Sequence, residues 1–558
     1  MKQFDPFMDS VHSLQFDVIV IGSGVGGLTA AALLSRTGIR VAVLEKEPRV
    51  GGYLAGFKRK GFRFDTAIHW LNQCSATGSV SKVFDFIGKD PPSFKCLEKI
   101  QRYKSESIDF LLTNNPDEFK NLLIKTYPDD KQGIIRFFQK AKKIGASFNN
   151  FKTVLLAAET MNLLSRIKNI LGLLRFGLPF IPFIPYSGKR MEKGLNKFFS
   201  NKKIHDVFSS ETDLLSCLVP IGWAYYNDYQ TPPPGGGQVI PQWLASVIKQ
   251  HGNPLFLNTI VKRIVIENGI VKGVEASCKG KELLFKAKYV IAACDLDTVY
   301  SKLLPEGVIS KKMINRLNTA EIYASSFTLS IALNCSAASL GFGEEMVHLF
   351  KDGISKDLHN SGDPDFSALS ILAPSHKDHS LAPEGKGTLV VFMPAYMHQY
   401  DQWHTGAGIK RGEEYVELKN RIAEKLIERL ELVYPGLAAQ ILFYEAATPV
   451  THWRYTGNKN GTMMGTKPNK SNMRSGVARY KTPVKNLLIG GHWAELGGGV
   501  PIAVKAGTNA ALIVLKEQLP VACQKIIGYF NAKLTLDEMN RAPEFKGPGQ
   551  DLKVDTSG

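Results

Sequence analysis

The N-terminal part of the chain alternates apolar runs with a glycine-rich turn. Phe16 to Ile21 is mostly apolar and β-branched, which is typical of a parallel strand buried on both faces. The glycines of 22–27 follow at once, and the small residues of 28–34 predict a helix that ends near Gly38. Val41 to Glu45 predicts the next strand. The pattern therefore predicts a βαβ unit.

Two later segments repeat this rhythm. Residues 254–299 contain three short apolar strand patterns, and residues 486–515 contain a strand, a glycine cluster and a helix. The blocks between them are rich in aromatic and charged residues and carry no glycine fingerprint. We therefore expect an α/β protein, with a discontinuous Rossmann-like domain and an inserted α+β domain. The expected boundaries are 14–100, 231–300 and 441–520 for the Rossmann-like domain, 101–230 and 301–440 for the insertion, and 521–558 for a C-terminal helix with a polar, frayed tail.

Composition narrows the class of protein. The 558 residues include 69 Lys and Arg against 51 Asp and Glu, a net charge of +18. An electropositive surface favours anionic partners without choosing among nucleic acid, lipid and acidic substrate. The seven cysteines are scattered, with no Cys-x-x-Cys pair. We therefore expect neither a metal site nor a disulfide framework, and a reducing, cytoplasmic compartment.

The glycine turn itself predicts dinucleotide binding. Gly22 permits the tight turn, Gly24 lets the backbone approach a pyrophosphate, and Gly27 lets the helix pack on the strand. The helix N-terminus offers free amides to the phosphates. Glu45, at the end of the second strand, is placed to accept hydrogen bonds from an adenosine ribose. The alternative is a glycine turn that binds nothing.

The continuation distinguishes the cofactor. Arg49-Val50-Gly51-Gly52-Tyr53-Leu54-Ala55-Gly56-Phe57 leads into Gly61-Phe62-Arg63-Phe64-Asp65-Thr66-Ala67-Ile68-His69-Trp70. Near the C-terminus stand Gly490-Gly491, Gly497-Gly498-Gly499-Val500-Pro501 and Ala506-Gly507. Together these motifs resemble the phytoene desaturase superfamily of FAD-dependent oxidoreductases, in particular its carotenoid isomerase and retinol saturase branch. The resemblance covers the three Rossmann-like segments well and the inserted blocks poorly.

The resemblance implies a single extended FAD. It implies that the C-terminal glycine loop meets the ribityl chain and flavin edge, and that Val261 contacts the adenine through its backbone. Arg49 can neutralise diphosphate charge. The expected FAD-binding residues are Gly22, Gly24, Gly26, Gly27, Glu45, Lys46, Arg49, Gly51, Gly52, Tyr53, Val261, Gly491, His492, Gly499, Val500 and Pro501.

Two histidines are the candidate acid/base residues. His69 and His492 fall in segments expected to flank the flavin, and imidazole titrates nearest neutral pH. The alternative is that each holds loop backbone or cofactor. His492 stands where the family usually has aspartate, and Ala67 where it often has glycine. Asp65 is expected to pin its own turn.

A basic amphipathic block follows in the first inserted segment. Apolar residues recur at helical spacing in 154–176, and 150–203 carries ten basic against two acidic residues. Prolines interrupt the apolar run 170–186, so we expect no membrane-spanning helix. We expect peripheral contact with an anionic membrane; the alternative is a helix packed on its own domain.

These observations predict an FAD-dependent oxidoreductase. By resemblance, its substrate is a hydrophobic polyene or isoprenoid lipid, desaturated, saturated or isomerised at a carbon–carbon bond. No second glycine fingerprint exists for a nicotinamide nucleotide, so we expect a diffusible electron donor or acceptor. The alternatives are a flavin amine oxidase and, from a different class, a non-catalytic flavin-containing or basic binding protein. We expect no nucleic-acid partner, because no recognisable module is present.

Overall fold

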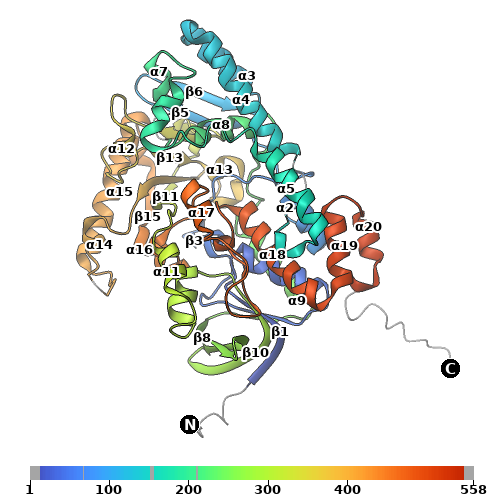
Figure 1. Ribbon diagram of the computed structural model, residues 1–558. Coiled ribbons are helices and arrows are strands. Elements are labelled where there is room, and N and C mark those ends of the chain that lie inside the picture. The colour runs from blue at the N-terminus through green and yellow to red at the C-terminus, as the bar shows by residue number, and fades with distance from the viewer. Residues whose placement is uncertain (1–12, 67, 151–155, 209–210, 407, 546–558) are drawn as a thin grey trace, which may run out of the picture.

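Two seven-stranded sheets organise the computed structural model, which describes residues 13–66, 68–150, 156–208, 211–406 and 408–545 (Figure 1). The sheet with β1, β8 and β10 lies in the lower half of Figure 1. The sheet with β5, β6 and β13 lies in the upper half, beneath a block of helices. Both sheets draw their strands from segments far apart in the chain.

The first sheet has the order β7-β2-β1-β10-β9-β8, with β16 paired to β10. Its strands are β1 (Ser13–Ile21), β2 (Val41–Leu44), β7 (Leu255–Phe256), β8 (Thr259–Glu267), β9 (Ile270–Cys278), β10 (Lys281–Ala292) and β16 (Leu487–Ile489). β7, β2, β1, β10 and β16 run parallel, so the loops after them meet at one edge. The Rossmann-like α/β fold expected from the sequence is confirmed.

Helices α1 (Val25–Arg36) and α18 (Val500–Gln518) pack against each other beside this sheet. The approach is close because a Cβ on Gly507 would lie 2.1 Å from the carbonyl oxygen of Gly26. α18 begins at Val500, directly after the glycine cluster, since Pro501 in its first turn loses no hydrogen bond. α9 (Val239–Gln250) packs on α1.

The second sheet has the order β15-β11-β14-β13-β12-β5-β6. Its strands are β5 (Lys99–Lys104), β6 (Asp109–Thr113), β11 (Ser325–Leu333), β12 (Met346–Leu349), β13 (Leu369–Leu372), β14 (Gly387–Ala395) and β15 (Ile441–Ala447). Only the β12–β5 pair is parallel. One face packs on α15 (Glu413–Val433), and the other carries Phe392, which packs with Phe62 and Phe64. The second sheet thus turns one face toward the cofactor-side segment 57–70.

The described helical block contains α3 (Pro116–Thr126), α4 (Lys131–Asn150), α5 (Leu163–Gly177) and α8 (Leu214–Ala224). α4 and α8 approach closely, because a Cβ on Gly145 would lie 2.1 Å from the Gly222 carbonyl oxygen. The amphipathic helix expected over 154–176 begins later, at Leu163, where the side chain of Asn162 accepts a hydrogen bond from the Ser165 N–H. Residues 154 and 155 of that expectation lie outside the described part of the chain.

Two expected boundaries differ from the structure. β15 pairs with β11 in the second sheet, although 441–520 was assigned to the Rossmann-like domain. Part of the tail that is expected to fray within 521–558 instead forms α20 (Leu536–Arg541), because Thr535 and Glu538 make a reciprocal capping box. Buried Met539 and Phe545 fix this segment against the core that contains α19 (Pro520–Phe530).

Candidate functional site

The glycine turn after β1 leaves open space in front of a helix N-terminus. Gly22 has φ +98°, and a Cβ on Gly27 would lie 2.2 Å from the Gly22 carbonyl oxygen, so both positions require glycine. Gly24 is the N-cap of α1 and makes no side-chain cap. A Cβ at Gly24 would meet no atom within 4 Å. The first amides of α1 therefore face a free space that suits an anionic group.

Glu45 lies at the end of β2, beside this turn. Its Oε2 accepts hydrogen bonds from the N–H and the hydroxyl of Ser23, at 2.8 and 2.6 Å. Its Oε1 accepts from the Glu47 N–H at 2.9 Å. These bonds fix the carboxylate, which is only 8% exposed, next to the open face of Gly24. The arrangement suits a carboxylate that receives ribose hydroxyls.

The C-terminal glycine loop joins the same place. A Cβ on Gly26 would lie 2.9 Å from the Gly490 carbonyl oxygen and 3.3 Å from the Gly491 Cα. Gly51 donates its N–H to the Ser23 carbonyl at 2.9 Å and forms a bridge with Gly24. The segments around 22–27, 45–52 and 490–501 therefore converge. Gly499 has φ +85° and is the N-cap of α18, so a second helix N-terminus without a side-chain cap begins in this region.

The residues present fit an FAD. Two helix N-termini supply free amides, Gly24 supplies room for a diphosphate, and Glu45 supplies a fixed acceptor. β8 starts beside the end of β2, where Thr259 donates its N–H to the Glu45 carbonyl at 2.8 Å. Val261 follows two residues later along β8 and is partly exposed. Its contact with the adenine remains a prediction.

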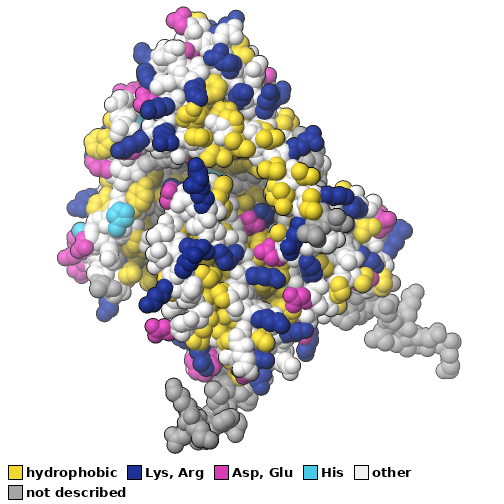
Figure 2. Space-filling view, in the orientation of Figure 1, with side chains coloured by type: hydrophobic (Ala, Val, Ile, Leu, Met, Phe, Trp, Pro, Cys, Tyr) yellow, Lys and Arg dark blue, Asp and Glu magenta, His cyan; other side chains and the backbone are white. Residues whose placement is uncertain are grey.

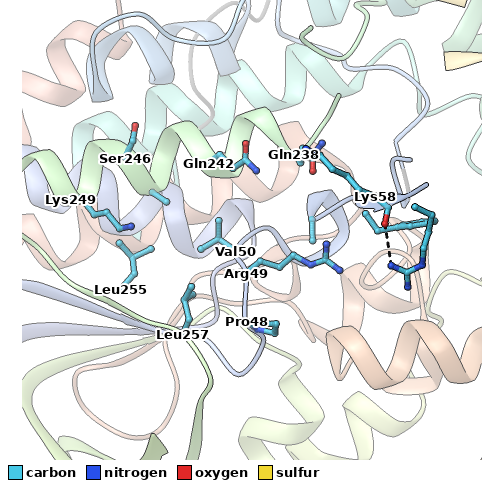
Figure 3. A pocket seen from close by; sticks show the side chains of 14 residues that line it. Pro48, Arg49, Val50, Lys58, Gln238, Gln242, Ser246, Lys249, Leu255 and Leu257 are labelled. Carbon is cyan, nitrogen blue, oxygen red and sulfur yellow. Dashed lines mark hydrogen bonds between the residues drawn. The ribbon is translucent and has the colours of Figure 1, made fainter. Parts of the chain in front are cut away.

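The other predicted cofactor side chains have specific neighbours. The Tyr53 hydroxyl donates to the Thr462 carbonyl at 2.5 Å, and burial raises the pKa of Tyr53 to about 12. The Lys46 ammonium donates to the Arg454 carbonyl at 2.9 Å. Arg49 lines a cavity on the surface (Figure 3). Tyr53 and Lys46 therefore fasten the glycine segment to residues 454–462.

His69 lies between this region and the second sheet. Its ring meets Phe392 of β14 edge to face at 4.3 Å, and its Nδ1 is buried without a hydrogen-bond partner among the described residues. Burial, and then the nearby His348, lower the pKa of His69 to about 4. His69 is therefore neutral at pH 7. It can accept a proton or a hydrogen bond there, but it holds no proton to deliver as an imidazolium.

His492 occupies the glycine-loop side of the site. Its Nε2 is buried and has no partner among the described residues, and burial lowers its pKa to about 4. A Cβ on Gly465 would lie 2.8 Å from the His492 Cδ2, so the ring is closely confined. An unpartnered buried imidazole in this position suits a hydrogen bond to a bound group. Its role, like that of His69, remains a prediction.

Two further histidines, the partly buried His348 and the buried His452, were missed by sequence reasoning. His348 on β12 stacks on Tyr103 at 5.6 Å and approaches Ser370. His452 approaches Ser326 at 3.3 Å, and its ring lies 6.2 Å from that of Tyr53. Neither histidine belongs to a motif. The pairing of β12 in the second sheet places His348, and α16 (Pro449–Thr456), the helix that follows β15, places His452.

Asp65 connects the two halves of the molecule. Its Oδ1 accepts the Gly237 N–H at 2.9 Å, and the neighbouring Gly235 donates its N–H to Asp378 at 2.6 Å. Burial, and then the charge of Asp378, raise the pKa of Asp65 to about 6 against the pull of the Gly237 hydrogen bond. Asp65 therefore holds the glycine turn of 235–237, whereas the sequence predicts that it pins its own turn.

An apolar surface surrounds α5. Figure 2 shows yellow side chains gathered over α5 with dark blue Lys and Arg side chains beside them. Leu171 is 62% exposed and Leu178 is 61% exposed. The exposed aliphatic residues of this surface, called the α5 patch below, are Ile167, Ile170, Leu171, Leu173, Leu174, Leu178, Ile181 and Ile184. Such contiguous exposure is unusual for a monomer and marks an interaction surface.

The segment that carries the patch contacts both the first-sheet half of the molecule and the aromatic residues beneath α5. Asn509 of α18 accepts the Ala157 N–H at 2.8 Å, just before α5. On the other side, a continuous row of aromatic rings leads inward from α5. The rings in order are Phe176, Phe148, Trp223, Tyr229, Trp70 and His69, with centroid separations of 5.4, 5.6, 6.0, 5.3 and 5.8 Å.

Comparison with curated proteins finds relatives over most of the chain. An all-trans-retinol 13,14-reductase of Danio rerio is 25% identical over 91% of this chain and 87% of its own. An inactive all-trans-retinol 13,14-reductase of the same species is 26% identical over 85% and 82%. A chloroplastic prolycopene isomerase of Daucus carota is 25% identical over 93% and 84%. These similarities confirm the resemblance to the carotenoid isomerase and retinol saturase branch.

Solved structures share the fold. An oxidoreductase from Methanosarcina mazei has a TM-score of 0.55 at 17% identity, covering 89% of this chain and 99% of its own. Putrescine oxidase bound to putrescine has a TM-score of 0.56 at 15% identity, covering 90% and 99%. The model of the family described as flavin containing amine oxidoreductase matches residues 25–515. The chain thus belongs to the flavin-containing amine oxidoreductase family and is an FAD-dependent oxidoreductase.

Proposed function

We propose that the protein oxidises, reduces or isomerises a carbon–carbon bond of a hydrophobic polyene, of the retinoid or carotenoid kind, drawn from a membrane surface. The observation that carries this proposal is the α5 patch with the ring row that leads from it to His69. A long apolar substrate needs an apolar place to leave the lipid, which the patch provides, and apolar surroundings beside the cofactor, which the packed rings next to His69 provide. The names of the curated relatives support the same substrate class.

In this proposal the chain contributes placement and a dry site. FAD, when bound, supplies two-electron redox chemistry at its ring. The backbone amides of the 22–27 turn and Glu45 hold its adenosine diphosphate end, and the loop from Gly491 to Pro501 holds its flavin end. Neutral His69 accepts a proton or orients the substrate against Phe392. His492 is its counterpart on the cofactor side.

The membrane contact is peripheral in this proposal. Among the described residues, no helix combines the length and apolar character needed to cross a bilayer. Each aliphatic side chain of the α5 patch contributes about 1–2 kcal/mol on entering an apolar phase. Arg166, Lys168 and Arg175 stand on the same helix and would add about 1 kcal/mol each near anionic lipid. A diffusible carrier then supplies or removes the electrons.

The test is a reconstituted assay. The FAD-loaded protein is mixed with vesicles that contain phosphatidylserine and either all-trans-retinol or a carotene, under reducing and under oxidising conditions, and the products are separated by chromatography. We expect a product that differs from its substrate by two hydrogens or in double-bond geometry, formed faster on anionic than on neutral vesicles.

Two results would contradict the proposal. Peroxide release with amines and no change in polyenes would favour the amine oxidase alternative. A protein that keeps its yellow flavin spectrum yet converts none of the polyenes would favour the non-catalytic alternative. The non-catalytic alternative has a parallel among the curated relatives, one of which is named as inactive.

A further inference from the structure

A cavity of about 580 Å³ lies between the segment 48–59 and helix α9 (Figure 3). Arg49 is its one wall residue that is also expected to touch FAD, and the glycine turn 22–27, Glu45 and the 491–501 loop do not line it. The cavity is therefore a separate place on the outer side of the Arg49–Gly52 segment. The proposed reaction makes no use of it.

The charged groups around this cavity all have the same sign. Arg49, Lys58, Arg59 and Lys249 line it, and no carboxylate does. Arg59 pairs with Glu445 at 3.2 Å, and its guanidinium also donates to the Lys58 carbonyl, the dashed line in Figure 3. Within the described residues, no carboxylate oxygen lies within 4 Å of the charged nitrogens of the other three. Uncompensated cations around a concavity favour an anionic ligand.

The rest of the lining is partly apolar and partly hydrogen bonding. Gln238, Gln242 and Ser246 are spaced four residues apart and present amides and a hydroxyl from one face of α9. Val50, Leu255 and Leu257 supply apolar surface opposite the helix, as Figure 3 shows. A ligand that matches all three features carries an apolar or planar body, a few polar edge atoms and a multiply charged anionic group.

We propose that this cavity binds a phosphorylated small molecule of the size and class of a nucleoside diphosphate. Its phosphates pair with Arg49, Lys58 and Lys249, and its planar body lies on Val50, Leu255 and Leu257. The volume accommodates such a molecule without rearrangement. The same phosphate chemistry could be presented by a lipid headgroup, so the test separates the two sources.

Occupation also has a route to the cofactor. Arg49 and Val50 immediately precede Gly51, whose N–H bonds to Ser23 within the glycine turn. A ligand that holds Arg49 therefore restrains the Gly51 turn and slows the loss of FAD. The expected slower loss of FAD rests on the proposed position of the cofactor. Binding of the ligand in the cavity does not depend on that position.

The test uses the full chain loaded with FAD. Calorimetry measures the binding of ADP and, separately, of inorganic pyrophosphate, at low and at high ionic strength. The test variant is Lys58→Gln with Lys249→Gln. Its control is Lys272→Gln with Lys279→Gln, two exposed lysines of the first sheet and its turn that do not line the cavity. A third variant, Leu257→Asp, changes the apolar floor.

We expect ADP to bind without releasing FAD, more tightly than pyrophosphate, and more weakly as salt rises. The double lysine variant should weaken ADP binding at least tenfold, and Leu257→Asp should weaken ADP more than pyrophosphate. The control should bind as the parent does. Flotation with vesicles that contain phosphatidate provides the other arm: a lysine-dependent response there, without ADP binding, would assign the phosphate to a lipid headgroup.

Three results would overturn the inference. The first is that ADP displaces FAD. The second is that the lysine substitutions leave ADP binding unchanged. The third is that neither ADP, pyrophosphate nor phosphatidate vesicles bind. Each readout is a binding measurement, so it stands apart from polyene turnover. Failure of the proposed reaction would leave ADP binding intact, and failure of ADP binding would leave turnover intact.

Discussion

The cofactor side and the substrate side of this molecule are built by different means. On the cofactor side, backbone atoms form most of the site. Gly22 has a positive φ, Gly24 has an open face, and Gly27 lies in close contact with the Gly22 carbonyl. On the substrate side, side chains carried by separate strands and helices meet, as His69 meets Phe392. Backbone requirements restrict a position to glycine, whereas a packed side chain can be exchanged for another of similar shape. The substrate side is therefore where specificity can vary.

The largest expected effect lies at His69. Changing His69→Phe keeps the aromatic contact with Phe392 and removes both ring nitrogens, so turnover should fall by about 10²- to 10⁴-fold if the imidazole handles a proton. FAD content should stay unchanged. With a pKa of about 4, the neutral form prevails from pH 5.5 upward, so parental kcat/KM should be flat there and fall as pH drops through about 4. The measurement is a pH–rate profile for both proteins.

The matched control is His492→Phe. Because His492 stands in the glycine loop, its loss should change the flavin spectrum or the FAD affinity more than the rate. Equal rate losses in the two variants, with altered flavin spectra in both, would show that His69 contacts the cofactor. The proposed distinction between a cofactor side and a substrate side would then be wrong.

The second effect tests the open face of Gly24. Gly24 has φ −65°, and its Cβ would meet no protein atom, so Gly24→Ala should fold normally. The methyl group would enter the space assigned to the diphosphate, and FAD affinity should fall by about 10- to 100-fold, the 1–3 kcal/mol typical of overpacking. Flavin fluorescence titration of the apoprotein measures this change. Gly177→Ala, also free of contacts, is the control. An unaltered FAD affinity would move the cofactor away from this turn.

This asymmetry also explains what the sequence could predict. The sequence predicts the parts of the fold in which the backbone restricts the residue type. These are the buried strands at 16–21, 41–45 and 487–489, which require β-branched and apolar residues, and the three converging turns, which require glycine. The second sheet has no such local sequence signal, because β5 pairs with β12 and β11 pairs with β15 across more than a hundred residues. His348 reaches the site through that pairing, and His452 reaches it on the helix α16 that follows β15. The capping signal Thr535 to Glu538 was present in the sequence and would have predicted α20.

The third effect concerns the α5 patch. Leu171→Glu places a charge where a side chain is 62% exposed, so folding should be unaffected while binding to anionic vesicles falls by about tenfold. Lys168→Gln should weaken the same binding about fivefold at low salt and much less at 0.5 M salt. Co-sedimentation measures both, with Lys272→Gln as the control for total charge. If Leu171→Glu binds vesicles as the parent does, the patch does not bind the membrane, and a protein partner becomes its expected ligand.

The smallest effect on activity is expected at the junction between the two sides, where the change alters stability. The carboxyl of Asp65 has a folded-state pKa of about 6 against an ordinary value of 3.8, because burial and Asp378 disfavour its charge. The folded state therefore holds a proton that the unfolded state releases between about pH 4 and 6, so this group costs stability as pH rises through that range. Asp65→Asn keeps an oxygen that can accept the Gly237 N–H and removes the buried charge. Because one pKa unit corresponds to about 1.4 kcal/mol, the change should raise the free energy of unfolding by about 2–3 kcal/mol well above pH 6 and by much less at pH 4. Denaturant unfolding at both pH values measures the difference. A variant less stable at pH 8 than the parent would mean that the charge of Asp65, through its bond to Gly237, holds the two sides together more strongly than burial opposes it.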